Sequence, residues 1–227
     1  MLKIGVPTGR SRPRTRPRGD AGRGGRRGGR GSGREWWGGV DGVVGGEGVL
    51  LSAGGSPREW AGGVVQRGVR GSDLVRDKRA DWAMRAVQVA AVGVGHADLI
   101  LAVPTAWVDV DTLDDLDAAA SAFRRAHGFR LRIATKYHRL VRDFLTENGV
   151  ADYQLVDSQG ATEGTVRNLT AEAIADITST GETLRANHLK ILEDAVIHKS
   201  QATLFAARNA DWTDAMGPMQ ALMARLG

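Results

Sequence analysis

The chain has 227 residues, of which 42% are hydrophobic and 25% are charged, and its formal net charge is +5 at pH 7. This length is enough for one large domain or two small ones with a buried core, and the absence of cysteine excludes disulfides, thiolate metal sites and a cysteine nucleophile. The sequence contains no apolar run that could span a bilayer and no secretory signal pattern, so we expect a cytoplasmic protein without a membrane partner.

Basic charge is concentrated in one low-complexity tract, residues 9–34, which holds ten arginines, nine glycines and one aspartate. The remaining residues are net acidic, so we expect no basic face and no nucleic-acid partner. The tract has too few apolar groups to fold and is predicted to be disordered. Two interpretations stay open. It is either an RNA-binding segment, since residues 23–25 and 27–29 are RGG triplets without aromatic neighbours, or GC-rich coding DNA read out of frame, which we favour.

The first hundred residues predict short strands separated by turns. In chain order we expect a strand at 2–6 ended by Pro7, a strand at 49–51, a helix at 57–67, a strand end and turn at 69–73, and an apolar segment without a clear period at 82–94.

From Gly95 onward strands and helices alternate, which is typical of an α/β fold with a parallel sheet. The expected strands are 98–103, 131–134, 153–156, 173–177, 189–196 and 201–206. The expected helices are 113–126, capped by Asp111 or Thr112 and followed by Gly128; 137–148, ended by Gly149; and a broken helix at 212–226.

Three polar segments, residues 135–137, 160–165 and 178–183, each follow one of these strands. Ligands of open parallel sheets bind beyond the carboxyl ends of the strands, so we expect the three segments to share one edge. The two later turns are rich in glycine and hydroxyl groups, and each is predicted to open a helix whose free N–H groups suit a phosphate. The carboxylates of Glu163 and Asp176 suit ribose hydroxyls or Mg²⁺. The pattern predicts a sugar-phosphate site, although each turn taken singly could be only a helix cap.

The motifs Gly160-Ala161-Thr162-Glu163 and Ser179-Thr180-Gly181-x-Thr183-Leu184-x-Ala186-Asn187 flank the run 171–177. Together with residues 132–149, 95–107 and 200–202 they resemble the ATP phosphoribosyltransferase family, whose enzymes catalyse the first step of histidine biosynthesis. The resemblance is continuous over residues 95–207 and weaker upstream.

The resemblance implies a two-lobed α/β fold like that of type II periplasmic binding proteins, with the active site in the cleft between the lobes. The first lobe would combine residues 1–95 with 196–227, and the second, which binds phosphoribosyl pyrophosphate, would span 96–195. Strands near 97–103 and 201–206 would act as the hinge. The chain ends before the family's C-terminal regulatory domain would begin. It is therefore similar to the short form, which forms a hetero-oligomer with a histidyl-tRNA-synthetase-like regulatory subunit.

The implied activity is that of a glycosyltransferase, which joins N1 of ATP to C1 of phosphoribosyl pyrophosphate, with Mg²⁺ as cofactor, and releases pyrophosphate. Such a reaction needs alignment and charge neutralisation more than a protein nucleophile. The alternative function is a non-catalytic two-lobed module that binds a small anion, but the paired carboxylates of Glu163 and Asp176 favour an enzyme.

The resemblance also assigns roles to individual residues. Glu163 and Asp176 are the candidate catalytic residues, facing ribose hydroxyls or Mg²⁺, and no metal ligand is firmly assigned. The phosphoribosyl group would contact Asp157, Gly160, Ala161, Thr162, Glu163, Gly164, Thr165, Ser179, Thr180, Gly181 and Thr183, with the hydroxyls of Thr162 and Thr165 as donors. ATP or pyrophosphate would contact Arg10, Lys136, Tyr137, Gly71 and Asp73.

The first lobe departs from the family pattern. The family has a Ser-Lys-Gly-Arg-like loop and then an amphipathic helix after its first strand. Here the loop reads Thr8-Gly9-Arg10 without the lysine, and the tract 9–34 replaces the helix. Arg70 stands where the family has a threonine in a glycine-rich turn.

Two further groups of residues have structural interpretations. The acidic cluster Asp109, Asp111, Asp114, Asp115 and Asp117 lacks the EF-hand spacing and suits the start of a helix. The five histidines show no metal-ligand spacing, so we expect them on the surface or near the hinge.

Overall fold

The computed structural model describes residues 2–7, 37–39, 46–51, 67–78, 81–91, 93, 95–158, 160–218 and 220. The chain forms two compact units: the first contains residues 1–71, 81–95 and 202–227, and the second contains residues 72–80 and 96–201. Both units are α/β, as the sequence predicted. The tract 9–34 lies outside the described residues, as does the expected helix at 57–67 except for Arg67. Of the expected helix at 212–226, residues 212–218 and 220 are described, and among them 216–218 and 220 are helical.

The boundary between the units differs from the predicted one at two segments, 72–80 and 196–201, which were expected in the first lobe and belong to the second unit. Residues 198–200 pair with residues 97–99 of the second unit, and a buried polar contact joins the segment 72–80 to them. The Ser200 hydroxyl donates to the Asp73 carboxylate at 2.5 Å and accepts from the Asp73 backbone N–H at 3.3 Å. This contact joins residues 127 positions apart, so no local pattern in the sequence announces it.

The first unit is built on a six-stranded sheet in which β1 pairs in parallel with β3 and β4, while β11 runs antiparallel between β4 and β5. The sheet order is β2 (Trp37–Gly39), β3 (Gly46–Leu51), β1 (Leu2–Pro7), β4 (Arg67–Gly71), β11 (Ala202–Ala207) and β5 (Ala86–Ala91). Trp82 begins the short helix α3 (Trp82–Arg85) and packs edge-on against the buried Phe205 ring, with 6.1 Å between the two ring centroids.

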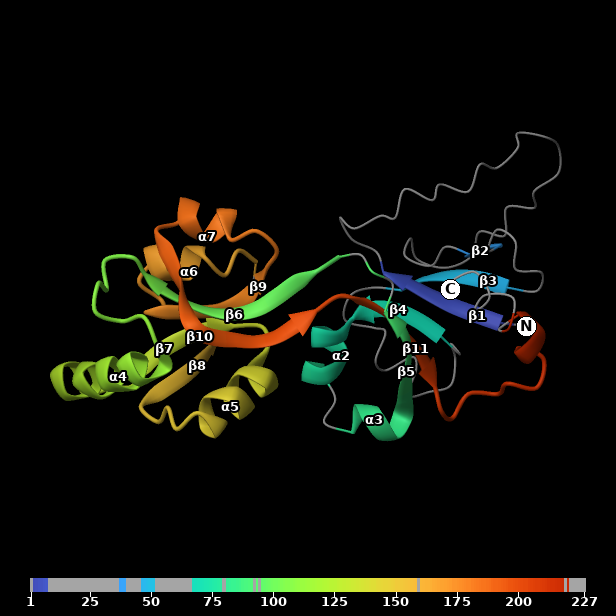
Figure 1. The fold of residues 1–227 in the computed structure, drawn as a ribbon, viewed down its shortest axis with the longest axis horizontal. Coiled ribbons are helices and arrows are strands. Elements are labelled where there is room, and N and C mark those ends of the chain that lie inside the picture. Colours follow the sequence, from blue (N-terminus) through green and yellow to red (C-terminus); the bar gives the residue numbers. More distant parts are fainter. Residues whose placement is uncertain are drawn as a thin grey trace. The chain divides into compact units, whose positions relative to one another are not determined.

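The second unit is built on a five-stranded sheet (Figure 1). Its order is β10 (Leu189–Ser200), β6 (Ala97–Pro104), β9 (Ala173–Thr178), β7 (Leu131–Thr135) and β8 (Tyr153–Asp157). Strands β9, β7 and β8 are parallel to one another, as predicted, but β6 is antiparallel to both β9 and β10. The sheet is therefore mixed. The sequence did not predict this, because an apolar run indicates a strand but not the direction in which it pairs.

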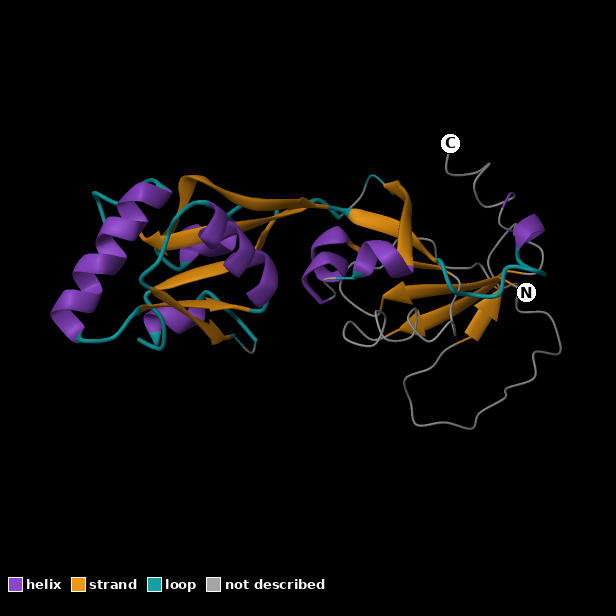
Figure 2. Cartoon of the chain, turned by 90° about the horizontal axis from the view of Figure 1, so that it is seen from below, coloured by secondary structure: helices purple, strands orange, loops and turns teal. Residues whose placement is uncertain are grey.

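Helices cover both faces of this second sheet (Figures 1 and 2). On one face α4 (Leu113–His127) and α5 (His138–Glu147) bury Leu116 and Val141 against Leu99 and Leu101. On the other face lie α6 (Gly164–Arg167) and α7 (Glu182–Ala186), and Leu184 packs there. A further helix, α2 (Ser72–Lys78), contacts α5 and β10. No helix in the described part of the chain is long and apolar enough to cross a membrane.

Helix α4 has the ends that the sequence predicted. Thr112 is its N-cap: the side chain accepts from Asp115 N, and the Asp115 carboxylate accepts from Thr112 N at 2.9 Å, which forms a capping box. The hydrogen bond from the Thr112 hydroxyl holds the pKa of Asp115 below its usual value. Gly128 ends the helix in the left-handed region with φ 78°. The acidic cluster is thus used in part by the helix start.

Replacing Thr112 by alanine should lower the free energy of unfolding by about 1 kcal/mol, because the α4 N-cap loses its acceptor. Urea unfolding followed by circular dichroism measures this change. The variant Thr112→Ser keeps a hydroxyl and should stay close to wild type. Equal losses in the two variants would contradict the capping role.

Candidate functional site

The three polar segments predicted from the sequence follow adjacent parallel strands of the second unit. Thr135 at the end of β7 pairs with Asp157 on β8 and with Ala175 on β9. The carboxyl ends of these strands therefore meet at one edge of the sheet, and the segments that follow β7, β8 and β9 start side by side.

Lys136 links these segments. Its ammonium donates to the carbonyl of Gly160, in the loop after β8, at 2.6 Å. It also lies 3.7 Å from the Asp176 carboxylate on β9. Asp176 is largely buried, and its other oxygen accepts the backbone N–H of Ile177 at 2.8 Å. The Lys136 ammonium thus joins the segment 135–137 to the segment 160–165 and to the Asp176 carboxylate on β9.

The loop after β8 is held together by its own hydroxyl groups. The Ser158 hydroxyl donates to that of Thr162 at 2.7 Å, and both residues are buried. The Thr165 hydroxyl donates to the Thr162 carbonyl at 2.7 Å. Thr162 and Thr165, expected as donors to a ligand, thus take part in the turn itself. Within the described part of the chain the backbone N–H of Glu163, a partly exposed residue, has no acceptor, which leaves it for an anion.

The turn after β9 has a similar construction. The side-chain oxygens of Thr178 and Thr180 accept the N–H groups of Gly181 and Glu182 at 2.9 and 3.3 Å. The Ser179 hydroxyl donates to the carbonyl of His96 at 2.8 Å. Gly181 has φ 69°, a conformation in which a side chain would be strained. Both turns open helices, as predicted, but α6 and α7 have only four and five residues, so individual N–H groups matter more here than a helix dipole.

Tyr137 and Asp73, both expected near ATP or pyrophosphate, are each only 4% exposed. Burial raises the pKa of the Tyr137 phenol well above its ordinary value, and the carboxylate of Asp73, to which the phenol is hydrogen-bonded, adds to the rise. This placement favours a role inside the second unit for both side chains. Gly71 ends β4 in the first unit, and Arg10 lies outside the described residues.

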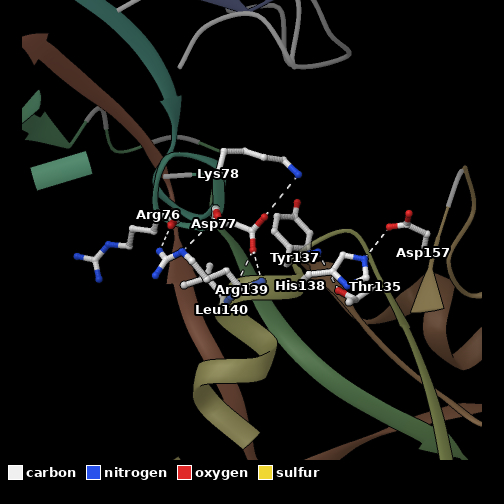
Figure 3. Close-up of polar contacts among 9 residues, drawn as sticks. All are labelled: Arg76, Asp77, Lys78, Thr135, Tyr137, His138, Arg139, Leu140 and Asp157. Atoms are coloured by element: carbon white, nitrogen blue, oxygen red, sulfur yellow. Dashed lines mark hydrogen bonds and ion pairs between the residues drawn. The ribbon is translucent and has the colours of Figure 1, made fainter. Parts of the chain in front are cut away.

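His138 is a neighbour of the site that the sequence did not single out. Its Nε2 lies 2.6 Å from an Asp157 carboxylate oxygen, as Figure 3 shows. Asp157 was expected to contact the phosphoribosyl group and remains exposed beside this histidine. The positions of the two residues in the sequence could have predicted this contact. His138 begins the helix that follows β7, and Asp157 ends β8, the strand next to β7.

The half-buried histidine His198, on β10, lies beside Ser72, the first residue of α2. His198 Nε2 is 2.8 Å from the Ser72 hydroxyl. Burial lowers the pKa of His198, and the nearby Arg76 lowers it further, which favours the neutral imidazole. This contact adds to the Ser200–Asp73 bond in tying α2 to β10.

Comparison with known proteins gives concordant results. The sequence model of the family described as ATP phosphoribosyltransferase matches residues 57–227. A curated ATP phosphoribosyltransferase from Cereibacter sphaeroides is 68% identical over 227 residues, which are 100% of this chain and 96% of that protein.

Solved structures agree on the fold. The ATP phosphoribosyl transferase (HisG:HisZ) complex from Thermotoga maritima matches with a TM-score of 0.68 at 18% identity, covering 100% of this chain and 96% of that chain. A putative L-cystine ABC transporter from Listeria monocytogenes matches with a TM-score of 0.51 at 11% identity, covering 80% of this chain and 74% of that chain. At these identities the likeness concerns the fold, and it fits the two-lobed arrangement that the sequence predicted.

The raised pKa of Tyr137 predicts that its phenol stays protonated in the native protein as the pH rises through about 10, where an exposed tyrosine ionises. Its contribution to stability is complete below the unfolded-state pKa of about 10 and is lost as pH rises toward the higher folded value. Tyr137→Phe should therefore leave the native tyrosinate absorbance unchanged over this range and remove half of the tyrosinate signal after denaturation, because the chain has two tyrosines. A native signal that falls in the variant would show that the phenol is not buried.

Proposed function

The chain belongs to the ATP phosphoribosyltransferase family, and from this premise we propose which of its residues hold the substrates. The enzyme is a glycosyltransferase of the first step of histidine biosynthesis. It transfers the phosphoribosyl group of phosphoribosyl pyrophosphate to N1 of ATP and releases pyrophosphate.

The phosphoribosyl group is proposed to bind at the edge formed by the ends of β7, β8 and β9. The position of the Lys136 ammonium carries this proposal, because it contacts both the loop after β8 and Asp176 on β9. The 5-phosphate is assigned to the loop 160–165, where the N–H group of Glu163 is available. Residues 179–183, in the turn after β9, are also assigned to the phosphoribosyl group.

The chemistry requires alignment and charge neutralisation. As the bond from C1 to pyrophosphate lengthens, positive charge develops on the sugar and negative charge on the leaving group. The proposed role of Lys136 is to neutralise pyrophosphate, since an ammonium has three donors and one is used by Gly160. Glu163 and Asp176 are proposed to accept hydrogen bonds from the ribose hydroxyls, which fixes the ring for attack by N1 of ATP.

Enzymes of this family need a divalent metal ion, and we propose Mg²⁺. Within the described part of the chain no group of three His, Asp or Glu side chains is arranged to hold a metal. A pair of carboxylates is enough for the proposed Mg²⁺, which is commonly held by one or two carboxylates together with substrate phosphates. Asp176 and Glu163 are the carboxylates proposed to contribute. When bound, the ion supplies additional positive charge for the pyrophosphate.

A second kind of chain is proposed as partner. The Thermotoga maritima neighbour is a HisG:HisZ complex. The proposed partner is a histidyl-tRNA-synthetase-like regulatory subunit in a hetero-oligomer, and the proposed location is the cytoplasm.

Release of pyrophosphate from ATP and phosphoribosyl pyrophosphate, with Mg²⁺ and with or without the proposed partner, tests the function. Glu163→Gln and Asp176→Asn should each lower turnover by about 10- to 100-fold, because each change removes a charge beside the reacting sugar. Asp114→Asn, an exposed change of the same kind on α4, is the control and should be silent. Unchanged turnover in both site variants would remove Glu163 and Asp176 from the mechanism.

A further inference from the structure

Helix α5 has no N-cap of its own. Tyr137 occupies the N-cap position, but its side chain makes no capping hydrogen bond. The N–H groups of the first turn need acceptors from elsewhere. Asp77 of α2 supplies them: one carboxylate oxygen lies 3.0 Å from Arg139 N and 3.3 Å from Leu140 N (Figure 3).

The same contact also caps α2. Arg76 and Asp77 lie in its last turn, where backbone carbonyls have no partner within the helix. The Arg139 guanidinium donates to the carbonyls of both, with Nε 3.3 Å from the Asp77 oxygen. Asp77 is only 8% exposed, so loss of its carboxylate would leave buried donors unpaired. The two helix ends therefore satisfy each other.

Lys136 lies in the short corner between β7 and this capped turn. On the strand side, the buried Thr135 side chain accepts the Tyr137 N–H at 3.0 Å. On the helix side, Asp77 holds the N–H groups of Arg139 and Leu140. The backbone of Lys136 is thus fixed at both ends.

We propose that Asp77 is a positioning residue of the phosphoribosyl transfer: by capping α5 from α2, it holds Lys136 where its ammonium reaches the substrate. The inference rests on the proposed function of Lys136. Asp77 itself is assigned no contact with the substrate.

The dissociation constant of phosphoribosyl pyrophosphate, measured by calorimetry on the full chain with Mg²⁺, provides the test. Asp77→Ala should weaken binding about tenfold, because Lys136 loses its fixed position. Asp77→Asn keeps an oxygen that can accept both N–H groups and should stay within about threefold of wild type. Asp143→Ala is the matched control, since Asp143 also contacts Arg139, at 3.1 Å, but from the exposed surface of α5; it should be silent.

A double-mutant cycle with Lys136→Met separates positioning from a general loss of structure. If Asp77 acts through Lys136, Asp77→Ala should add nothing in the Lys136→Met background. Additive losses, or equal losses in Asp77→Asn and Asp77→Ala, would overturn the inference while leaving the role of Lys136 intact. If Lys136→Met alone leaves binding unchanged, the proposed function of Lys136 fails and this inference fails with it.

Amide hydrogen exchange gives a readout that is independent of substrate. The N–H groups of Arg139 and Leu140 should exchange faster in Asp77→Ala than in wild type and should stay protected in Asp143→Ala. Unchanged exchange in Asp77→Ala would overturn the proposed cap. If that variant does not fold, Asp77→Ser, whose shorter side chain cannot bridge the helices, is compared in the same way.

Discussion

The Lys136 ammonium connects the parts of the second unit from which a sugar-phosphate site can be built. It joins the loop after β8 to Asp176 on β9 from the corner that follows β7. Partly exposed ion pairs of this kind contribute little to stability. An ammonium with one firm hydrogen bond and one longer carboxylate contact keeps capacity for an anion. We therefore interpret the position of the Lys136 ammonium as suited to the proposed ligand rather than as a contribution to stability. The loop after β8 and Asp176 on β9 hold the ammonium in that position.

The sequence predicted the elements whose signals are local. Buried runs ended by glycine or hydroxyl-rich turns gave β7, β8 and β9 and the segments after them, and Thr112 and Gly128 marked the ends of α4. It predicted only a turn where α2 lies. That helix has seven residues and is fixed by groups far along the chain, Ser200 and Arg139, which no window of sequence brings together. The contact of Asp77 with the start of α5 was missed for the same reason.

Hydroxyl groups show a different limit of sequence reasoning. Thr162 and Thr165 were expected as ligand donors and Thr180 was expected to line the same site, yet each takes part in a hydrogen bond within its own turn. A serine or threonine beside a glycine has the same sequence signature in both roles. In the folded chain these side chains fix the loops, and fixed loops present their free N–H groups without further ordering on binding. Preorganisation of this kind is what an electrostatically driven transfer requires.

The proposed phosphoribosyl site and its supporting contacts lie entirely within the second compact unit, residues 72–80 and 96–201. The family match begins at residue 57, downstream of the arginine- and glycine-rich tract. Whatever the origin of that tract, it does not supply any residue of the Lys136 cluster or of the α2–α5 contact. Binding of phosphoribosyl pyrophosphate tests the second unit, whereas turnover with ATP also tests the departures from the family pattern, which are the missing lysine beside Thr8 and Arg70 in place of a threonine. Loss of binding would locate a defect in the second unit. Weak turnover with intact binding would point to those departures or to the carboxylates of Glu163 and Asp176.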